Sequence, residues 1–439
     1  MYTRKPALNI KKSIALGAVC SLLNFSMASA VEFDAGGSVR LRGESKQDFN
    51  LDDSSQTYWL SQVRFNLNTK VNENHSFFVE LQDARVYGED DNGVPFINED
   101  ARNQPFADQL DLHQAFWKYT GENYSLKVGR QKFNIGDKRL VASLEWVNTA
   151  RVHDGVRFTY KAEDRTFDVF ASTLVSVDPD HFNDQSTSNN RYFDSDFHGV
   201  FVTDNVIMPN HKTEYWWFYR GNDSGVFDDS IHTLGARIVG SKGRWAWDLQ
   251  GAWQTGDFYD VSRGILLDHE AEMVHMSATY KLAGSTIGIG YNWASGDDDP
   301  TDNDHGTFDN LYPLNHAYYG YMDLFSLQNV HNFEVTYARP EMFGSKAKLR
   351  IALQNFWLDD TKDAWYNAGL RGNAARLNAA LTTGADSYVG SEIDVTVAMP
   401  IAGINFLAGY SHFFAGSYTE DTGNDSNAHF LFLQAKKTF

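Results

Sequence analysis

Cysteine and long apolar runs are the features that this sequence of 439 residues lacks most clearly. Its single cysteine is Cys20, so the rest of the chain has no thiol for a disulfide, a thiolate metal site or a cysteine nucleophile. No stretch of about 18 consecutive apolar residues occurs, and the sequence therefore offers no transmembrane helix.

Positive charge is also scarce. The chain has 38 Lys and Arg against 57 Asp and Glu, which gives a formal net charge of −19 at pH 7. This imbalance makes nucleic acid a poor partner, because a phosphate backbone is bound through neutralising Lys and Arg side chains. Acidic residues at this density are expected in long, solvated loops.

The first 30 residues resemble a secretory signal peptide. A basic region precedes an apolar stretch at residues 14–25, and Ala28-Ser29-Ala30 supplies the small side chains of a cleavage site. Cleavage after Ala30 predicts a mature domain of residues 31–439 with a net charge of −23, because four basic residues and no acidic ones are removed. Cys20 lies inside the removed segment. The basic residues are Arg4, Lys5, Lys11 and Lys12.

Aromatic residues are abundant, at 14% of the chain, although the mean hydropathy is only −0.44. Apolar and polar residues alternate, as where Val39 and Leu41 alternate with Arg40 and Arg42. A period of two is that of a β-strand, whose successive side chains point to opposite faces. In a soluble sandwich the apolar face would be the core, whereas in a transmembrane barrel it would face lipid and the polar face would line water.

About 18 strands follow from this alternation, which makes the chain all-β. The predicted ranges are 33–44, 59–71, 76–87, 110–119, 124–131, 153–160, 166–173, 197–203, 213–220, 233–239, 244–254, 272–282, 285–294, 330–339, 346–357, 388–398, 403–412 and 428–439. The last strand places Leu431, Leu433 and Phe439 on one face and Gln434 and Lys436 on the other. A closing strand with an apolar outer face is typical of a barrel that the outer-membrane assembly machinery recognises.

The connections decide between the two architectures. Short ones are expected at 72–74, 120–123, 161–165, 241–243, 283–284 and 400–402. Long ones are expected at 88–109, 132–152, 174–196, 255–271, 295–329 and 358–387. Alternating short and long connections favour a single antiparallel up-and-down transmembrane barrel with short periplasmic turns, long extracellular loops and both ends in the periplasm.

Arginines on the polar faces and in the connection 132–152 are the candidate pore-lining and substrate-binding residues. Guanidinium stays charged and binds carboxylates with paired hydrogen bonds, so these side chains could form a cationic lining. The alternative is that they balance inner-wall acids such as Asp248, Glu334 and Glu392, and both interpretations stay open for each arginine. The candidates are Arg40, Arg42, Arg64, Arg130, Arg139, Arg151, Arg157, Arg237 and Arg350.

One acidic segment, residues 296–306, has the oxygen-rich composition of a calcium loop. It lacks the full ligand spacing and the closing Glu, so a solvated external turn is favoured over structural calcium, and no other metal or cofactor is expected. The weak calcium candidates are Asp297, Asp299, Asp302 and Asp304.

An outer-membrane hydrolase using a lumen carboxylate pair is the enzymatic alternative. Carboxylate pairs occur throughout so acidic a chain, and no Gly-x-Ser-x-Gly elbow is present. The sequence therefore indicates a protein that is not an enzyme.

Several motifs resemble the signature of the alginate-export family of outer-membrane porins. The most specific are GYNWASGDD at 290–298, TFDNLYP at 307–313 and NHAYYGYMD at 315–323. Further similar segments are GRQ at 129–131, SLEW at 143–146, RVHDG at 151–155, GSEID at 390–394 and GYSHFFAG at 409–416. The resemblance implies a monomeric barrel of 18 strands with an arginine-rich constriction for anionic polymannuronate-type chains. It carries Arg130, Arg139, Arg151 and Arg157 over as matches within the motif region.

The expected function is passive diffusion of an anionic saccharide, such as alginate or a uronate oligosaccharide, across the outer membrane of a Gram-negative bacterium. The alternative within transport is a porin for other small solutes, in which the arginines only contribute to the electrostatic field of the pore. The expected partners are the saccharide, outer-membrane lipid and lipopolysaccharide, and the barrel-assembly machinery through the last strand. Nucleic acid is not among them.

Overall fold

The structure is a computed structural model in which residues 31–89, 106–176, 182, 195–222, 227–342 and 345–439 are described. The expected signal peptide, residues 1–30, and parts of the expected loops 88–109 and 174–196 lie outside the described residues. Within them, no helix is long and apolar enough to cross a membrane.

Eighteen long strands and one strand of two residues, β14, form a single sheet. The strands are β1 (Glu32–Gln47), β2 (Ser55–Lys70), β3 (His75–Glu89), β4 (Asp108–Thr120), β5 (Tyr124–Gln131), β6 (His153–Ala162), β7 (Arg165–Leu174), β8 (Asp196–Asp204), β9 (His211–Asn222), β10 (Asp229–Lys242), β11 (Trp245–Asp260), β12 (Ile265–Leu282), β13 (Ser285–Ala294), β14 (Asp304–His305), β15 (Val330–Arg339), β16 (Lys348–Trp357), β17 (Tyr388–Ile401), β18 (Ile404–Ala415) and β19 (Ala428–Thr438). The long strands confirm the predicted set.

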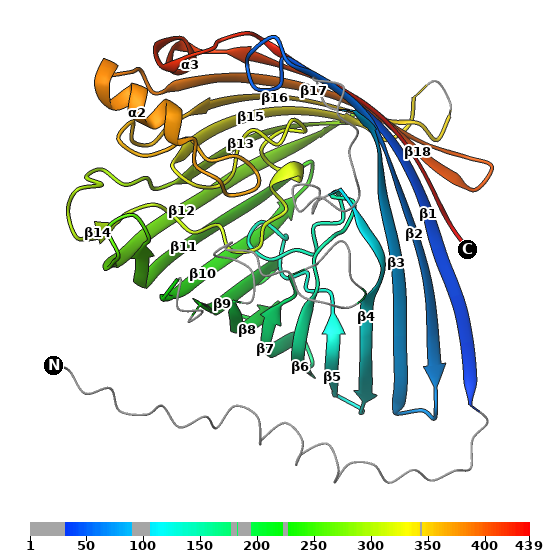
Figure 1. The fold of residues 1–439 in the computed structure, drawn as a ribbon. Helices are drawn as coiled ribbons and strands as arrows, with labels where there is room; N and C mark the ends of the chain where they lie inside the picture. Colours follow the sequence, from blue (N-terminus) through cyan, green and yellow to red (C-terminus); the bar gives the residue numbers. More distant parts are fainter. Residues whose placement is uncertain (1–30, 90–105, 177–181, 183–194, 223–226, 343–344) are drawn as a thin grey trace, which may run out of the picture.

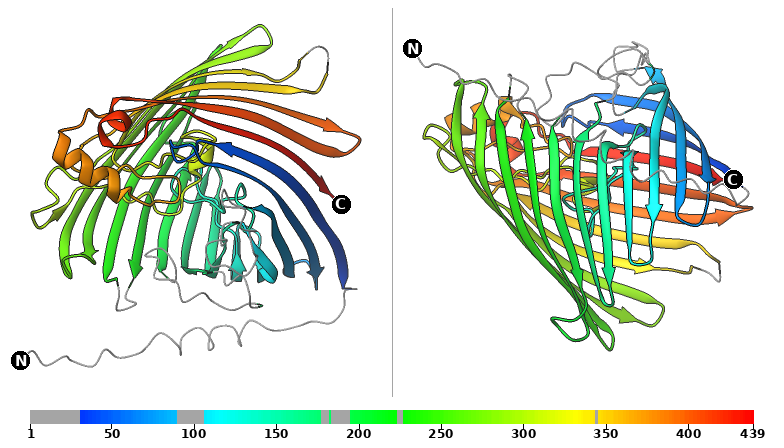
Figure 2. Two further views of the ribbon diagram at one scale, coloured as in Figure 1. Left: turned by 45° about the horizontal axis from the view of Figure 1, so that its top comes forward. Right: turned by 90° about the horizontal axis from the view of Figure 1, so that it is seen from below.

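The sheet closes into a barrel. Each long strand pairs antiparallel with the next, and β1 pairs with both β2 and β19, with Ser38 opposite Thr438 and Gln47 opposite His429. Figures 1 and 2 show this ring of strands, with blue β1 beside the red end of the chain. Closure satisfies every strand's hydrogen-bonding groups without leaving an edge, as the interior of a membrane requires.

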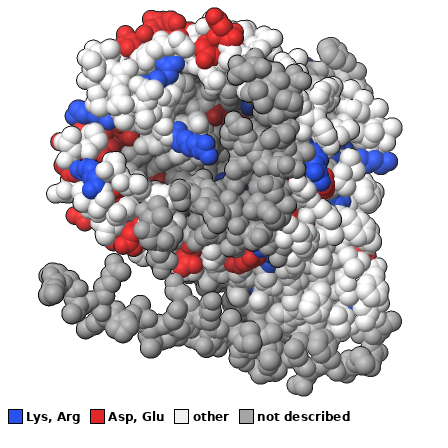
Figure 3. All heavy atoms as spheres, viewed as in Figure 1, with Lys and Arg blue, Asp and Glu red and all other residues white. Residues whose placement is uncertain are grey.

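The outer face of the wall is apolar. Trp59 and Leu431 are each 57% exposed, and other large apolar side chains in the same phase are also exposed, as expected for a surface that faces lipid. Figure 3 shows few charged side chains over the lower right of this view, and more of them toward its upper and left edges. The inner face carries the polar residues, such as the buried Arg40 and Arg64.

One predicted connection is wrong. Residues 255–271 were assigned to a long loop, but β11 continues to Asp260 and β12 begins at Ile265, so that only 261–264 connect them. The two strands stay in register from Gln254 opposite Ala271 to Asp260 opposite Ile265. Acidic residues and Gly256 made the segment look like a loop, yet cross-strand pairing extends the hairpin beyond the apolar band.

Apart from the four-residue connection 261–264, the long connections lie at one end of the barrel and mostly short turns at the other. Turns at one end include 283–284 and 340–347, whereas the loops at the other end include 132–152, 295–329 and 358–387. The last of these contains helix α2 (Ala374–Thr383), and α3 (Ser417–Thr422) packs beside it. Arg376 of α2 donates to the carbonyl of Thr419 in α3 over 3.1 Å, and these two helices pack together at the rim of that end, with α3 against β17.

Candidate pore constriction

Two loops fold back into the lumen. We call residues 132–152, between β5 and β6, the first inner loop, and residues 295–329, between β13 and β15, the second inner loop. They are joined where Ala142 N–H donates to the carbonyl of Tyr312 over 2.8 Å and Tyr312 N–H donates to that of Leu140 over 2.9 Å. Figure 2 shows both loops, in cyan and yellow, lying within the ring of strands.

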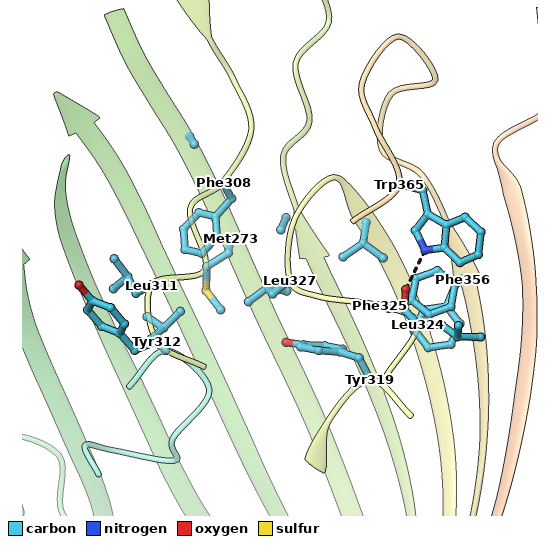
Figure 4. Close-up of a cluster of buried hydrophobic side chains, with 14 of the residues drawn as sticks. Met273, Phe308, Leu311, Tyr312, Tyr319, Leu324, Phe325, Leu327, Phe356 and Trp365 are labelled. Carbon is cyan, nitrogen blue, oxygen red and sulfur yellow. Dashed lines mark hydrogen bonds between the residues drawn. The ribbon is translucent and has the colours of Figure 1, made fainter. Parts of the chain in front are cut away.

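An apolar core forms between these loops and the inner wall. Tyr312 packs edge-on against Phe197 of β8, and Phe325 stacks on Phe356 of β16 with ring centroids 3.7 Å apart. Figure 4 shows Tyr312, Phe325 and Phe356 among the apolar side chains of this core. A core of this kind is unusual in a wall that otherwise faces water, and its burial holds both loops inside the barrel.

The second inner loop is also bound by acids of β17. Met322 N–H donates to Glu392 over 3.0 Å, and Tyr321 N–H donates to Asp394 over 3.4 Å. Gly320 has φ +93°, and a Cβ there would lie 2.4 Å from the Glu392 carboxyl group, so glycine is required at this close approach. Glu392 and Asp394 therefore bind the backbone of the loop instead of balancing an arginine.

A buried ion triad attaches the same loop to the opposite wall. The guanidinium of Arg220 on β9 lies 3.2 Å from Asp229 on β10 and 2.7 Å from Asp309 of the loop. All three side chains are almost fully buried. Sequence reasoning did not select Arg220, although its place on the inner face of β9 could be inferred from the exposed Trp217 in the opposite phase.

The first inner loop docks on β1–β3 through its backbone. Arg40 donates to the carbonyls of Glu145 over 2.7 Å and Val147 over 3.0 Å. Arg42 donates to the carbonyl of Trp146 over 2.7 Å. Two of the predicted arginines therefore position the loop.

A cationic cluster surrounds the Glu145 side chain at this point. Its carboxylate lies 2.7 Å from Arg64 Nη1 and 2.9 Å from Lys132 Nζ. Arg40 and Lys436 complete the cluster, since Arg40, Arg64, Lys132 and Glu145 are the charged neighbours of Lys436. Lys132 also contacts Glu80 at 3.3 Å, so four cations meet two carboxylates and the cluster keeps a net positive charge.

Glu145 is ionised within this cluster. Burial disfavours its charged form, but attraction to Arg64 and Lys132 outweighs burial and holds the pKa of the Glu145 carboxyl well below its usual range. It therefore remains a carboxylate at neutral pH, in direct contact with the cations.

A stack of three side chains fastens both inner loops to the wall. Trp146 lies between Arg42, whose guanidinium carbon is 3.9 Å from the ring centre, and His316, whose ring centre is 3.7 Å away at 14°. Nδ1 of His316 lies 3.0 Å from Asp323. The stack joins β1, the first inner loop and the second inner loop at one place.

We expect Trp146→Ala to loosen the attachment of the two inner loops to the wall. Loss of the cation–π contact and the ring stack removes about 1–3 kcal/mol of docking energy. In planar bilayers this should appear as larger mean conductance and noisier open-channel current. Trp146→Phe keeps a ring between Arg42 and His316 and should stay close to the wild type. An alanine variant with wild-type conductance and noise would contradict the role given to the stack.

The other predicted arginines are dispersed. Arg139 donates to Tyr319 over 2.7 Å, and Arg151 donates to the carbonyl of Pro313 over 3.3 Å, so both join the two inner loops. Arg157, Arg237 and Arg350 lie on the lumen face in ion pairs. Arg157 pairs with Asp168 at 3.0 Å, and Arg350 pairs with Glu334 at 2.7 Å. Arg237 pairs with both Asp248, at 2.5 Å, and Glu214, at 2.8 Å.

Arg130 differs from the lumen-facing arginines in strand phase. It lies opposite Asp154 in the sheet and binds that carboxylate with two hydrogen bonds of 2.9 and 3.0 Å. The neighbouring Gln131 and His153 are fully buried in the lumen, so Arg130 and Asp154 have the opposite phase, shared with the exposed Val156. Its charge also lies near the buried Asp111 and Asp108, so the expectation that Arg130 lines the pore remains a prediction.

The four calcium candidates do not converge. Asp297 accepts from the backbone of Asp299 over 3.2 Å, Asp299 from that of Thr301 over 3.2 Å, and Asp302 from that of Asp304 over 2.8 Å. These three carboxylates thus each close their own turn, and Asp304 lies in β14. Burial, the largest influence, raises the pKa of Asp297 to about 6. Among the residues that the structure describes, no three His, Cys, Asp or Glu side chains are placed to hold a metal ion.

Sequence reasoning did not select Lys132 or Lys436 for the site. Lys436 could have been found, because it lies on the polar face of the last strand. Lys132 begins a loop, where no strand phase indicates its direction. Proximity of both to Glu145 depends on the fold of the first inner loop.

A closed barrel of 18 long strands with an apolar outer wall and two inner loops defines a channel of the Gram-negative outer membrane. A comparison with protein families matches residues 31–434 to the family described as alginate export. The chain belongs to the alginate export family, which confirms the expected resemblance. No match was found among curated proteins.

Solved structures of outer-membrane channels share the fold. Pseudomonas aeruginosa OccK8 (OprE) has 14% identity, with 93% of this chain and 98% of that chain covered, and a TM-score of 0.61. Acinetobacter baumannii OccAB2 has 11% identity, coverage of 92% and 98%, and a TM-score of 0.63. Pseudomonas aeruginosa OccK2 (OpdF), solved in complex with glucuronate, has 12% identity, coverage of 92% and 98%, and a TM-score of 0.58. Identities this low support the fold alone.

Proposed function

We propose that this channel passes anionic saccharides carrying carboxylates, such as alginate or uronate oligosaccharides, by passive diffusion past the cationic cluster. The observation that carries the proposal is the meeting of Arg40, Arg64, Lys132 and Lys436 on one side of the inner loops. Fixed charge at a narrow, poorly hydrated place acts on a permeant with little screening, whereas salt screens charges in a wide vestibule within about 8 Å.

The dispersed ion pairs favour this cluster over the other arginines as the selective element. Arg130, Arg157, Arg237 and Arg350 each have a carboxylate partner within hydrogen-bonding distance, so their charge is already balanced locally. The cationic cluster has fewer carboxylates than cations. It can therefore attract an anion despite the acidic composition of the chain, and the solved glucuronate complex of OccK2 is compatible with a uronate permeant.

Neutralising Lys132 and Lys436 together tests the proposal. Arg40, Arg42 and Arg64 are left intact, because the first two hold the first inner loop and Arg64 donates to Gln82 on the wall over 2.7 Å. In a potassium chloride gradient, Lys132→Gln with Lys436→Gln should shift the reversal potential toward cations and weaken current block by glucuronate. Normal heat-modifiable migration in gels would show that the barrel is folded.

The matched control is Lys242→Gln with Lys281→Gln, which removes the same charge from exposed positions at the turn end of the barrel. This control should leave selectivity and block close to the wild type. Equal behaviour of the two double variants would reject the cluster as the selective site. It would favour the alternative, a porin for other small solutes without charge selection at the constriction.

The same proposal includes export of the chain through a signal peptide cleaved after Ala30, and assembly as a monomer. The outer-membrane assembly machinery would recognise β19, whose exposed Leu431 and Leu433 face outward. Lipid and lipopolysaccharide would then contact the apolar wall.

A further inference from the structure

The Glu145 carboxylate lies among the cations of the cluster without being needed to hold the first inner loop. The loop is attached through its backbone carbonyls, which accept hydrogen bonds from Arg40, Arg42 and Gln62, and through the ring of Trp146. The side chain of Glu145 contributes separate contacts, to Arg64 at 2.7 Å and Lys132 at 2.9 Å. Its role is therefore distinct from docking.

Glu145 is more accessible than either of its partners. Its side chain is 41% exposed, whereas that of Arg64 is only 4% exposed. Two donors of the cluster, Nε of Arg40 and Nη2 of Arg64, are buried and have no acceptor among the described residues. An unpaired buried donor is costly, so the cluster retains the capacity to bind a further oxygen ligand.

We propose that Glu145 is an internal carboxylate ligand of the cationic cluster, and that a permeating uronate displaces it. This inference rests on the proposed function, since it assigns the occupant of the same site in the absence of substrate. The two ligands are chemically equivalent, because each presents two oxygens that accept from Lys and Arg. Only one of them can occupy the Arg64 and Lys132 donors at a time.

Displacement requires little rearrangement. The loop stays attached by its backbone while the exposed Glu145 side chain turns into the lumen, and the permeant takes over the contacts with Arg64 and Lys132. When the permeant moves on, Glu145 returns and satisfies the cations again. Such competition keeps binding weak enough for release, as conduction demands.

Glu145→Gln is the direct test, with the whole channel in planar bilayers and glucuronate as the probe. If Glu145 occupies the cluster nine-tenths of the time, removing it should lower the half-blocking concentration of glucuronate about tenfold, because only the unoccupied fraction binds. The reversal potential should also shift further toward anions. Neutral glucose should block both channels equally.

Asp248→Asn is the matched control, since it removes one negative charge from the same lumen wall outside the cluster. This variant should leave glucuronate block within about twofold of the wild type. The charge of Asp248 lies outside the cluster, and salt screens its effect there. An unchanged or weaker block in Glu145→Gln, in a wild-type channel that does bind glucuronate, would overturn the internal-ligand inference alone. A wild-type channel with neither anion preference nor glucuronate block would instead refute the proposed function, and the inference with it.

Discussion

Arg220→Leu is expected to destabilise the protein by about 3–5 kcal/mol, because removing one member of a buried ion group leaves charge without compensation. The two carboxylates that would remain, Asp229 and Asp309, are almost fully buried. Asp309 also accepts the N–H of Leu311 over 2.8 Å, so its disturbance should detach the second inner loop from the wall. Unfolding by denaturant in detergent micelles would measure the loss.

Arg157→Leu provides the comparison. Its ion pair with Asp168 has the same kind of geometry, at 3.0 Å, but 23% of the Arg157 side chain is exposed to the lumen. Asp168 keeps the hydroxyl of Thr159 as a donor, and lumen water can enter the space that Arg157 leaves, so we expect a cost of about 1 kcal/mol or less. Similar losses in the two variants would show that burial of the Arg220 triad does not set its contribution.

Phe65→Arg is expected to impair assembly, whereas Asn66→Arg, at the next residue, should assemble normally. Phe65 is 53% exposed on the outer wall, so a guanidinium there would face lipid at a cost of about 2–4 kcal/mol near the bilayer midplane. Asn66 points into the lumen and lies opposite Glu80 of β3, which can pair with the new charge.

The measurement is the fraction of heat-modifiable barrel in outer-membrane preparations of each variant. Because the two substitutions introduce the same side chain one residue apart, expression and charge effects are matched. The opposite pattern would place the register of β2 one residue away from that described here.

The strand set was predictable because a membrane imposes a strict rule on each residue of the wall. Outward side chains must be apolar and inward ones polar, so apolar and polar residues alternate along segments such as Phe33 to Leu41. The strands within the segment 255–271 were not predicted, because they extend beyond the apolar band. There the pairing of β11 with β12 continues without a lipid-facing signal.

The site was only partly predictable. The place of Arg40, Arg42 and Arg64 on the lumen face follows from strand phase, whereas Arg130 shares the phase of Val128. The contact of Arg64 with Glu145 spans 81 positions, and that of Arg220 with Asp309 spans 89. No local pattern specifies contacts of this range.

The sequence by itself determined the barrel and the face on which each wall residue lies, because alternation against lipid and water is a local property. Only the tertiary structure decided which lumen charges meet. The paths of the two inner loops depend on an apolar core assembled from distant segments, with Tyr312 against Phe197 and Phe325 against Phe356. That core places Glu145 among the cations, and the selectivity that we propose for the channel depends on this placement.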